Sequence, residues 1–388
     1  MSKILFKGHI VYPDHVSESP ELIAVEGGTI TFVGRSEEFH CSGDYTVYDF
    51  GTAYVCPGFV DLHVHGSGGA DVMDGTPEAL HTIAEALARG GTTSFLAATM
   101  SAPKGSIEDA LNNVADATRQ ISGGARILGA HLEGPFLNRE KRGAQKEECL
   151  RPLDTNEFEA YLNAAKGTLK MITLAPELPG AIDLIKYAKA RGLVVSMGHT
   201  AASFDQVREA CRAGLSHVTH MFNAMSSMHH RDPGAVGAAL GLDELVVDII
   251  PDGYHIHPEI IKIAVQAKGV DNVCAITDCI RAGCMDDGEY GLGGQRVHVR
   301  AGTACLQDGT LAGSTLSMSR AVKMLVETVG LSIGEAVKMA ATNPARILGF
   351  GSKGRLRPAM DADITVVDRN FGVLMTMVGG QVVYSRGE

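Results

Sequence analysis

The chain has 388 residues, of which 45% are hydrophobic and 20% are charged, and its formal net charge is −11. This composition is typical of a soluble globular protein, and the length fits one large domain with an accessory part. The negative charge argues against a broad nucleic-acid-binding surface, which needs a basic face. It still allows an anionic small substrate, because two or three placed cations can set a local field.

Neither a membrane segment nor a secreted location is expected. No run approaches the roughly 18 apolar residues that a transmembrane helix needs, and the N-terminal residues 1–8 are typical of a short strand and not of a signal peptide. The eight cysteines show no Cys-x-x-Cys pair. In a chain of this length, such cysteines indicate reduced thiols, so we expect a cytoplasmic protein.

Residues 3–55 have the pattern of short strands, expected at 4–11, 22–25 and 29–34, with a hairpin turn at Gly27-Gly28. From residue 54 onward, apolar strands alternate with helices. The strands are expected at 54–65, 92–99, 126–133, 169–175, 193–199, 217–220, 245–250 and 272–278, and the helices at 77–90, 155–166, 180–191, 203–213 and 258–268. Eight such units over about 250 residues predict a parallel α/β fold of the (β/α)8 type.

The remainder of the chain begins with a glycine-rich stretch up to residue 313, which looks irregular apart from a strand-like run at 295–299. Helices are expected at 317–329 and 332–341, followed by strands at 362–368 and 380–384. We predict that the two β-rich ends pair into one small β-sandwich. The predicted domains are therefore 1–54 with 346–388 as the composite sandwich, and 55–345 as the TIM-like barrel.

Polar side chains stand at the C-terminal ends of the predicted barrel strands, where the catalytic groups of such barrels lie. Taken singly they carry little weight, because a lone histidine is more often a hydrogen-bonded core residue, and His-x-His also occurs at 255–257. Six such groups from five strands are hard to produce by accident. They are the ligand types that suit a divalent transition metal: His63, His65, Glu133, His199, His220 and Asp278.

Six motifs spread across the barrel resemble those of the amidohydrolase superfamily. Two of them, His131-Leu132-Glu133-Gly134-Pro135-Phe136 and 220–225, are specific to the branch that deacetylates amino-sugar phosphates. The full set is 57–66, 129–136, 198–200, 220–225, 252–255 and 277–278. The chain is thus similar to the N-acetylglucosamine-6-phosphate deacetylase family, whose composite sandwich also fits the β-rich ends.

The resemblance implies roles for the six strand-end residues. Glu133, His199 and His220 look like the ligands of a principal metal, and His63 and His65 look like the ligands of a second metal that Glu133 bridges. Asp278 looks like the catalytic carboxylate. We therefore expect one or two divalent metals per subunit, with zinc first and iron or manganese as alternatives.

The resemblance also implies substrate contacts. Backbone N–H groups at Asn223 and Ala224 are expected to hold a phosphate, and Arg231 matches a phosphate-binding arginine that in the family can come from a neighbouring subunit. A homodimer is therefore expected. His255 matches a substrate-binding histidine. Gln145 stands where many relatives carry a histidine that orients the acetyl carbonyl, and glutamine can donate a hydrogen bond there but cannot become cationic.

The implied reaction is metal-dependent hydrolysis of N-acetylglucosamine 6-phosphate to glucosamine 6-phosphate and acetate, with Asp278 as general base and acid. The same chemistry on N-acetylgalactosamine 6-phosphate is the alternative nearest to it. A cyclic-amide hydrolase resembling dihydroorotase typically uses a carbamylated lysine as the bridging ligand, and no suitable strand-end lysine is apparent here. A non-catalytic scaffold fits poorly with a complete ligand set.

Overall fold

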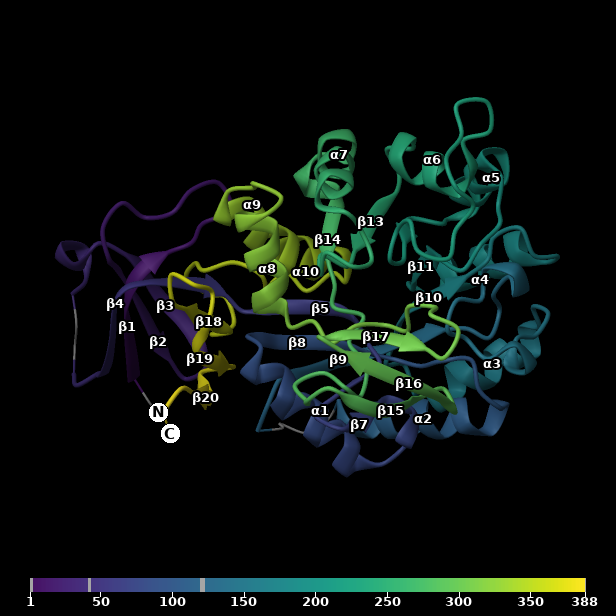
Figure 1. The fold of residues 1–388 in the computed structure, drawn as a ribbon. Helices are drawn as coiled ribbons and strands as arrows, with labels where there is room; N and C mark the ends of the chain where they lie inside the picture. The colour runs from purple at the N-terminus through teal and green to yellow at the C-terminus, as the bar shows by residue number, and fades with distance from the viewer. Residues whose placement is uncertain (1–2, 41–42, 119–122, 388) are drawn as a thin grey trace.

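The computed structural model describes residues 3–40, 43–118 and 123–387, and it contains two large sheets (Figure 1). One is an eight-stranded parallel barrel, and the other is a separate seven-stranded sheet built from both ends of the chain. The predicted fold class is therefore confirmed. Among the described residues, none of the helices is long and apolar enough to cross a membrane.

The barrel strands follow one another around the sheet in chain order, and each pairs in parallel with the next. They are β5 (Phe59–Val64), β8 (Thr92–Ala98), β9 (Arg126–Glu133), β10 (Leu169–Leu174), β11 (Val194–Met197), β12 (His217–Val218), β13 (Val246–Ile249) and β14 (Val273–Ala275). The segment after β14 closes the ring against β5. Asp278 donates its backbone N–H to His63 O at 3.0 Å, and His65 donates to Cys279 O at 2.9 Å. This closure brings residues 63, 65 and 278 together.

Helices cover the outside of the barrel, and most of them pack one apolar face against it. The helices are α1 (Pro77–Arg89), α2 (Lys104–Ala117), α3 (Thr155–Ala164), α4 (Ala181–Ala190), α5 (Phe204–Ala213), α6 (Gly234–Gly241), α7 (Pro258–Lys268) and α8 (Met318–Glu327). In α1, for example, Leu80, Ile83 and Leu87 are buried at helical spacing, and Thr76 caps its start by accepting from Ala79 N. The sequence analysis missed α2 and α6.

The seven-stranded sheet has the order β20-β19-β18-β4-β1-β2-β3. Its strands are β1 (Lys3–Ile10), β2 (Glu21–Glu26), β3 (Thr29–Gly34), β4 (Thr46–Pro57), β18 (Ile364–Val367), β19 (Val373–Val378) and β20 (Gln381–Ser385). The two chain ends meet where β18 pairs with β4. The predicted turn at Gly27-Gly28 is present, with φ of 58° and 87°, which glycine adopts readily.

One predicted strand is divided in two. The run 54–65 was expected to be one continuous strand. It breaks at Gly58 into the end of β4, which belongs to the seven-stranded sheet, and β5, which belongs to the barrel. A side chain at Gly58 would put Cβ only 2.2 Å from Thr93 Oγ1, so only glycine fits this crossing. The domain boundaries at 54/55 and 345/346 stay a prediction, and residues 1–2, 41–42 and 388 of the predicted sandwich lie outside the described residues.

The glycine-rich stretch that looked irregular forms a small antiparallel sheet beside the barrel (Figure 1). Its strands are β15 (Gly288–Leu292), β16 (Gln295–Arg300) and β17 (Thr303–Leu306), and the short β6 (Gly66–Ser67) and β7 (Ala70–Asp71) pair nearby. The helix expected at 332–341 contains α9 (Ile333–Val337) and continues as a π-helix at Lys338–Thr342 into α10 (Asn343–Ile347).

Candidate metal centre and active site

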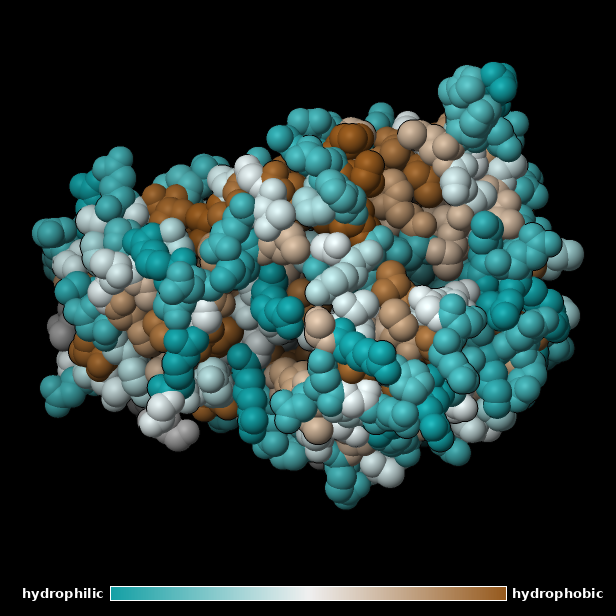
Figure 2. Space-filling view, in the orientation of Figure 1, coloured by the Kyte–Doolittle hydropathy of each residue, from teal (hydrophilic) through white to brown (hydrophobic). Residues whose placement is uncertain are grey.

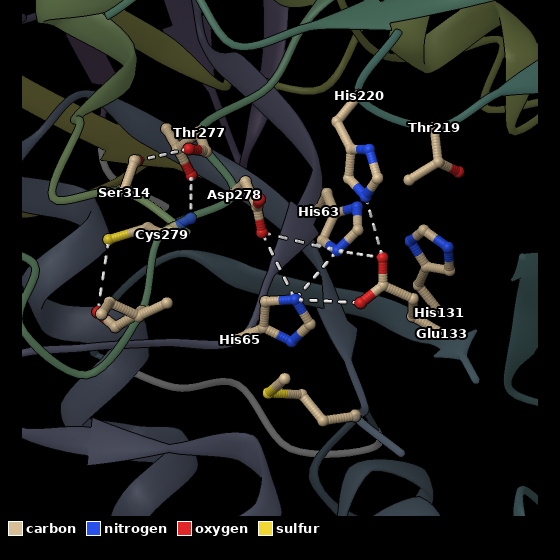
Figure 3. A network of polar contacts seen from close by, with 12 residues as sticks. His63, His65, His131, Glu133, Thr219, His220, Thr277, Asp278, Cys279 and Ser314 are labelled. Atoms are coloured by element: carbon tan, nitrogen blue, oxygen red, sulfur yellow. Dashed lines mark hydrogen bonds and ion pairs between the residues drawn. The ribbon is translucent and has the colours of Figure 1, made fainter. Parts of the chain in front are cut away.

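A buried carboxylate, Glu133 at the end of β9, is surrounded by the imidazoles of four histidines; Figure 3 shows His63, His65 and His220 beside it. His220 Nε2 lies 3.1 Å from Glu133 Oε1, and His199 Nε2 lies 3.4 Å from the same oxygen. His65 Nε2 lies 3.4 Å from Oε2, and His63 Nε2 lies 3.6 Å from Oε1. The residues come from four different strand ends, as the sequence analysis expected.

These side chains form two groups that share Glu133. One is His63, His65 and Glu133, and the other is Glu133, His199 and His220; in each group the ligand atoms lie within 4.8 Å of one another. Zinc–ligand distances of about 2.1 Å put neighbouring ligands of a tetrahedral site about 3.4 Å apart. The observed spacings to Glu133, 3.1 to 3.6 Å, fit that geometry.

The charges in this cluster also suit a cation. Burial raises the pKa of Glu133, but the imidazoles of His63, His199 and His220 outweigh this effect and hold the pKa well below its usual range. The Nε2 atoms of His63 and His65 lie only 3.0 Å apart. Two facing imidazole nitrogens beside a buried carboxylate are the donor set that a divalent metal accepts.

The backbone turns sharply at the ends of three strands. His199, His220 and Asp278 have φ of 47°, 33° and 49°, in the left-handed region that non-glycine residues rarely adopt. His199 Nδ1 donates to Lys141 O at 2.9 Å. Because a carbonyl oxygen can only accept, Nδ1 carries the proton and Nε2 keeps a free lone pair for a metal.

Asp278 stands beside the group formed by His63, His65 and Glu133. Its Oδ1 lies 3.3 Å from His65 Nε2 and 3.7 Å from His63 Nε2. Burial raises the pKa of Asp278, but the neighbouring imidazoles, His63 and His65 foremost, lower it to about 2. The carboxylate is therefore ionised at neutral pH and can accept a proton.

Another buried carboxylate, Asp61, anchors this arrangement and was not singled out from the sequence. Thr277 donates its hydroxyl to Asp61 Oδ2 at 2.6 Å and its backbone N–H to Oδ1 at 3.2 Å. Burial raises the pKa of Asp61 to about 7, although the hydrogen bonds from Thr277 oppose the shift. The available signal was an acid inside the fully buried strand Phe59–Val64.

A cavity of about 280 Å³ opens above Glu133 and Asp278. Four residues expected to bind substrate line it: Gln145, Asn223, Ala224 and His255. His63 is fully buried and does not line the cavity. Lining residues that the sequence analysis did not assign include Met100, Lys141, Leu292 and Thr310. The last two come from the region expected to be irregular, which explains why they were missed.

Comparison with known proteins identifies the family. Residues 54–383 match the model of the amidohydrolase family. The chain belongs to the amidohydrolase family. The resemblance to this family that the sequence analysis found is thereby confirmed. The family, together with the two histidine–glutamate groups, implies that the protein binds a divalent metal.

Several of the proteins to which the chain is similar are deacetylases. N-acetylglucosamine-6-phosphate deacetylase of Bacillus subtilis (strain 168) is 41% identical over 84% of this chain and 84% of its own. N-acetylgalactosamine-6-phosphate deacetylase of Escherichia coli O157:H7 is 37% identical over 84% of this chain and 87% of its own. Among solved structures, a mutant N-acetyl-D-glucosamine-6-phosphate deacetylase from Mycobacterium smegmatis, in complex with N-acetyl-D-glucosamine-6-phosphate, superposes with a TM-score of 0.92 at 32% identity, covering 99% of this chain and 100% of that one.

Two of the expected substrate residues of this amidohydrolase are held by local contacts. His255 Nδ1 lies 2.7 Å from Asp252 Oδ2, which fixes the ring at the cavity wall. Asn223 donates its backbone N–H to His220 O at 3.1 Å, closing the turn after β12. His257, the other member of the second His-x-His, instead caps α7 by accepting from Glu259 N, so its role is structural.

Arg231 does not line the cavity. It is exposed on the loop 226–233, which projects from the molecule just before α6 (Figure 1), and its Nη1 lies 2.6 Å from His230 Nε2. The metal, catalytic and substrate roles given to these residues stay predictions.

Proposed function

We propose that this amidohydrolase is a metal-dependent deacetylase that converts N-acetylglucosamine 6-phosphate to glucosamine 6-phosphate and acetate. The observation that carries the proposal is the ionised Asp278 beside a shared Glu133–imidazole donor set at the floor of the cavity. Its similarity to named deacetylases at 41% and 38% identity supports the substrate class.

The donor set would hold one or two divalent ions. Glu133, His199 and His220 would bind the principal ion, and His63 and His65 would share Glu133 with a second. A bound divalent metal supplies a nucleophile at neutral pH by lowering the pKa of water toward about 7, and it polarises the amide carbonyl. We propose zinc, with iron and manganese as alternatives, because all three accept carboxylate and imidazole ligands.

Asp278 would move the proton. Its carboxylate accepts a proton from the attacking water and then delivers that proton to the amide nitrogen as the C–N bond breaks. Without this delivery the sugar would leave as an unprotonated amide anion, which is a poor leaving group. The position of Asp278 supports this role, because its Oδ1 lies 3.3 Å from His65 Nε2 at the edge of the donor set and the residue lines the cavity.

Substrate recognition would come from the cavity wall. The acetamide would lie above Glu133 and Asp278, and His255, held by Asp252, would contact the sugar. The turn at Asn223 and Ala224 would face the phosphate through the backbone N–H of Ala224, because that of Asn223 already donates to His220 O. Ala224 has a φ of 53°, and successive N–H groups in such turns form anion-binding concavities.

We propose that the chain is a homodimer in which Arg231 reaches the neighbouring site. Two features support this arrangement: the exposed Arg231 loop, and apolar side chains on the same side of the barrel. Met228, Tyr254 and Ile263 are 60%, 53% and 52% exposed. Figure 2 shows hydrophobic surface over α7 and toward α6. A partner subunit would cover this surface.

A cytoplasmic location is also proposed. The seven cysteines of the described residues are all free thiols, which is usual in a reducing compartment.

The test is acetate release by purified, metal-loaded protein, measured with N-acetylglucosamine 6-phosphate, its galacto isomer and unphosphorylated N-acetylglucosamine. The expected result is fastest release from the phosphorylated gluco sugar. Faster release from the galacto isomer would favour the alternative that the Escherichia coli relative represents. An inactive metal-loaded protein would overturn the proposal.

A further inference from the structure

The loop between β9 and α3 contacts two members of the proposed metal site from outside. Lys141 O accepts from His199 Nδ1, and the side chain of Gln145 reaches Glu133. The three-stranded sheet β15-β16-β17 also contacts this loop, because Gln295 on β16 donates its side-chain N–H to Ala144 O at 2.6 Å. The loop is thus fixed on both sides.

Both ends of the Gln145 amide are occupied, and their partners dictate its orientation. Ser101 N donates to Gln145 Oε1 at 2.8 Å, and Gln145 Nε2 donates to Glu133 Oε2 at 2.7 Å. A backbone N–H can only donate and a carboxylate can only accept, so the amide is not free to flip. Gln145 is 3% exposed, so water does not compete for these hydrogen bonds.

The hydrogen bond selects one of the two oxygens of Glu133. Oε2, which Gln145 holds, is the oxygen nearest His65, whereas Oε1 faces His199, His220 and, at 3.6 Å, His63. A rotation of the carboxylate about its Cγ–Cδ bond would take one oxygen away from each group. The contact with Gln145 therefore fixes the plane of the carboxylate that the two groups share.

We propose that Gln145 is a positioning residue for the metal centre, acting through Glu133 and not through the substrate. It holds the carboxylate so that Oε2 faces His65 while Oε1 faces His199 and His220, and it thereby sets the affinity of the site on the His63 and His65 side. This inference rests on the proposed metal-dependent function. It gives Gln145 a role different from the contact with the acetyl group that the family resemblance suggests.

Two substitutions separate the contacts of Gln145. Gln145→Leu keeps the approximate volume and removes both hydrogen bonds. Gln145→Glu keeps an acceptor for Ser101 N but turns a second carboxylate oxygen toward Glu133 Oε2. A matched control is Gln206→Leu, which removes an exposed glutamine that belongs to the capping box of α5 and does not line the cavity.

The measurement is the dissociation constant of each zinc ion, obtained by competition with a chelator and by metal analysis, together with KM and kcat at saturating zinc. Removing an outer contact to a ligand typically weakens metal binding by about 10–100-fold. We expect that loss for Gln145→Leu at the His63 and His65 side, or at the single site if the wild type binds one ion. Gln206→Leu should bind zinc as the wild type does.

The outcomes distinguish the inference from the proposed function. Wild-type zinc affinity in Gln145→Leu, with a raised KM, would overturn the positioning role and favour a contact with the acetyl group. A Gln145→Glu variant that keeps wild-type affinity would also contradict it. A wild-type protein that binds zinc but releases no acetate would sink the deacetylase proposal while leaving the positioning role measurable. A wild type that binds no metal overturns both.

Discussion

The hydroxyl of Thr277 links the stability of the fold to the position of Asp278, and a single substitution can test this link. Thr277 is fully buried just after β14, next to Asp278, and it donates to Asp61 Oδ2 at 2.6 Å while accepting from Cys279 N at 3.2 Å. Thr277→Val removes that oxygen and preserves the shape of the side chain. One change therefore leaves a buried carboxylate and a buried N–H each short of a partner.

The expected cost follows from these two hydrogen bonds. A hydrogen bond contributes about 0.5–1.5 kcal/mol when its acceptor is neutral and about 1.5–3 kcal/mol when its acceptor is charged, and an unsatisfied buried donor costs about 1–3 kcal/mol. Because such contributions overlap, we expect the free energy of unfolding to fall by about 2–5 kcal/mol. Thr277→Ser keeps the oxygen and loses one buried methyl group, which costs about 0.5–1.5 kcal/mol.

The assay is denaturant unfolding of metal-free protein, followed by circular dichroism, so that metal binding does not add to the measured stability. The valine variant should be clearly less stable than the serine variant. On metal-loaded protein, kcat should fall further for valine than for serine, because the tether to Asp61 holds the backbone next to Asp278. A valine variant as stable as the serine variant would refute the hydrogen-bond argument.

Three further predictions concern the proposed mechanism. Asp278→Asn should lower kcat by about 10²–10⁴-fold with the metal content unchanged, and undiminished turnover would contradict the proton-transfer role. His63→Asn combined with His65→Asn should reduce the metal count per chain by one; metal analysis that finds the full wild-type count rules out their role as ligands. Arg231→Ala should raise KM for the phosphorylated sugar and weaken the preference over the unphosphorylated one, while an unchanged preference argues against the phosphate contact.

A single carboxylate connects the two halves of the candidate metal site. Glu133 faces four imidazoles from the ends of β5, β11 and β12, and the loop that follows β9 returns to hold both Glu133 and His199. The ligands and the contacts that orient them therefore come from different barrel loops. Substitutions in the loop 139–146 should weaken metal binding more than they lower the stability of the fold.

Some of this could be predicted from the sequence because it depends on local patterns. Alternating apolar strands and helices indicate a parallel barrel, and parallel strands bring their C-terminal ends to one face. That rule alone places His63, Glu133 and Asp278 on the same face of the barrel. The hairpin at Gly27-Gly28 was equally local, since both residues need positive φ.

Other features were beyond prediction because their partners are far apart in the chain. Asp61 and Thr277 are separated by 216 residues, and Ser101 and Gln145 by 44, so no local pattern links them. The break at Gly58 depends on how closely Thr93 approaches from the next barrel strand. The sequence by itself determined the barrel, its strand ends and the chemical types of the ligands, because these follow from periodicity and residue type. Only the tertiary structure decided which oxygen of Glu133 faces which histidine and what holds it there, because hydrogen-bond partners are chosen by distance in space.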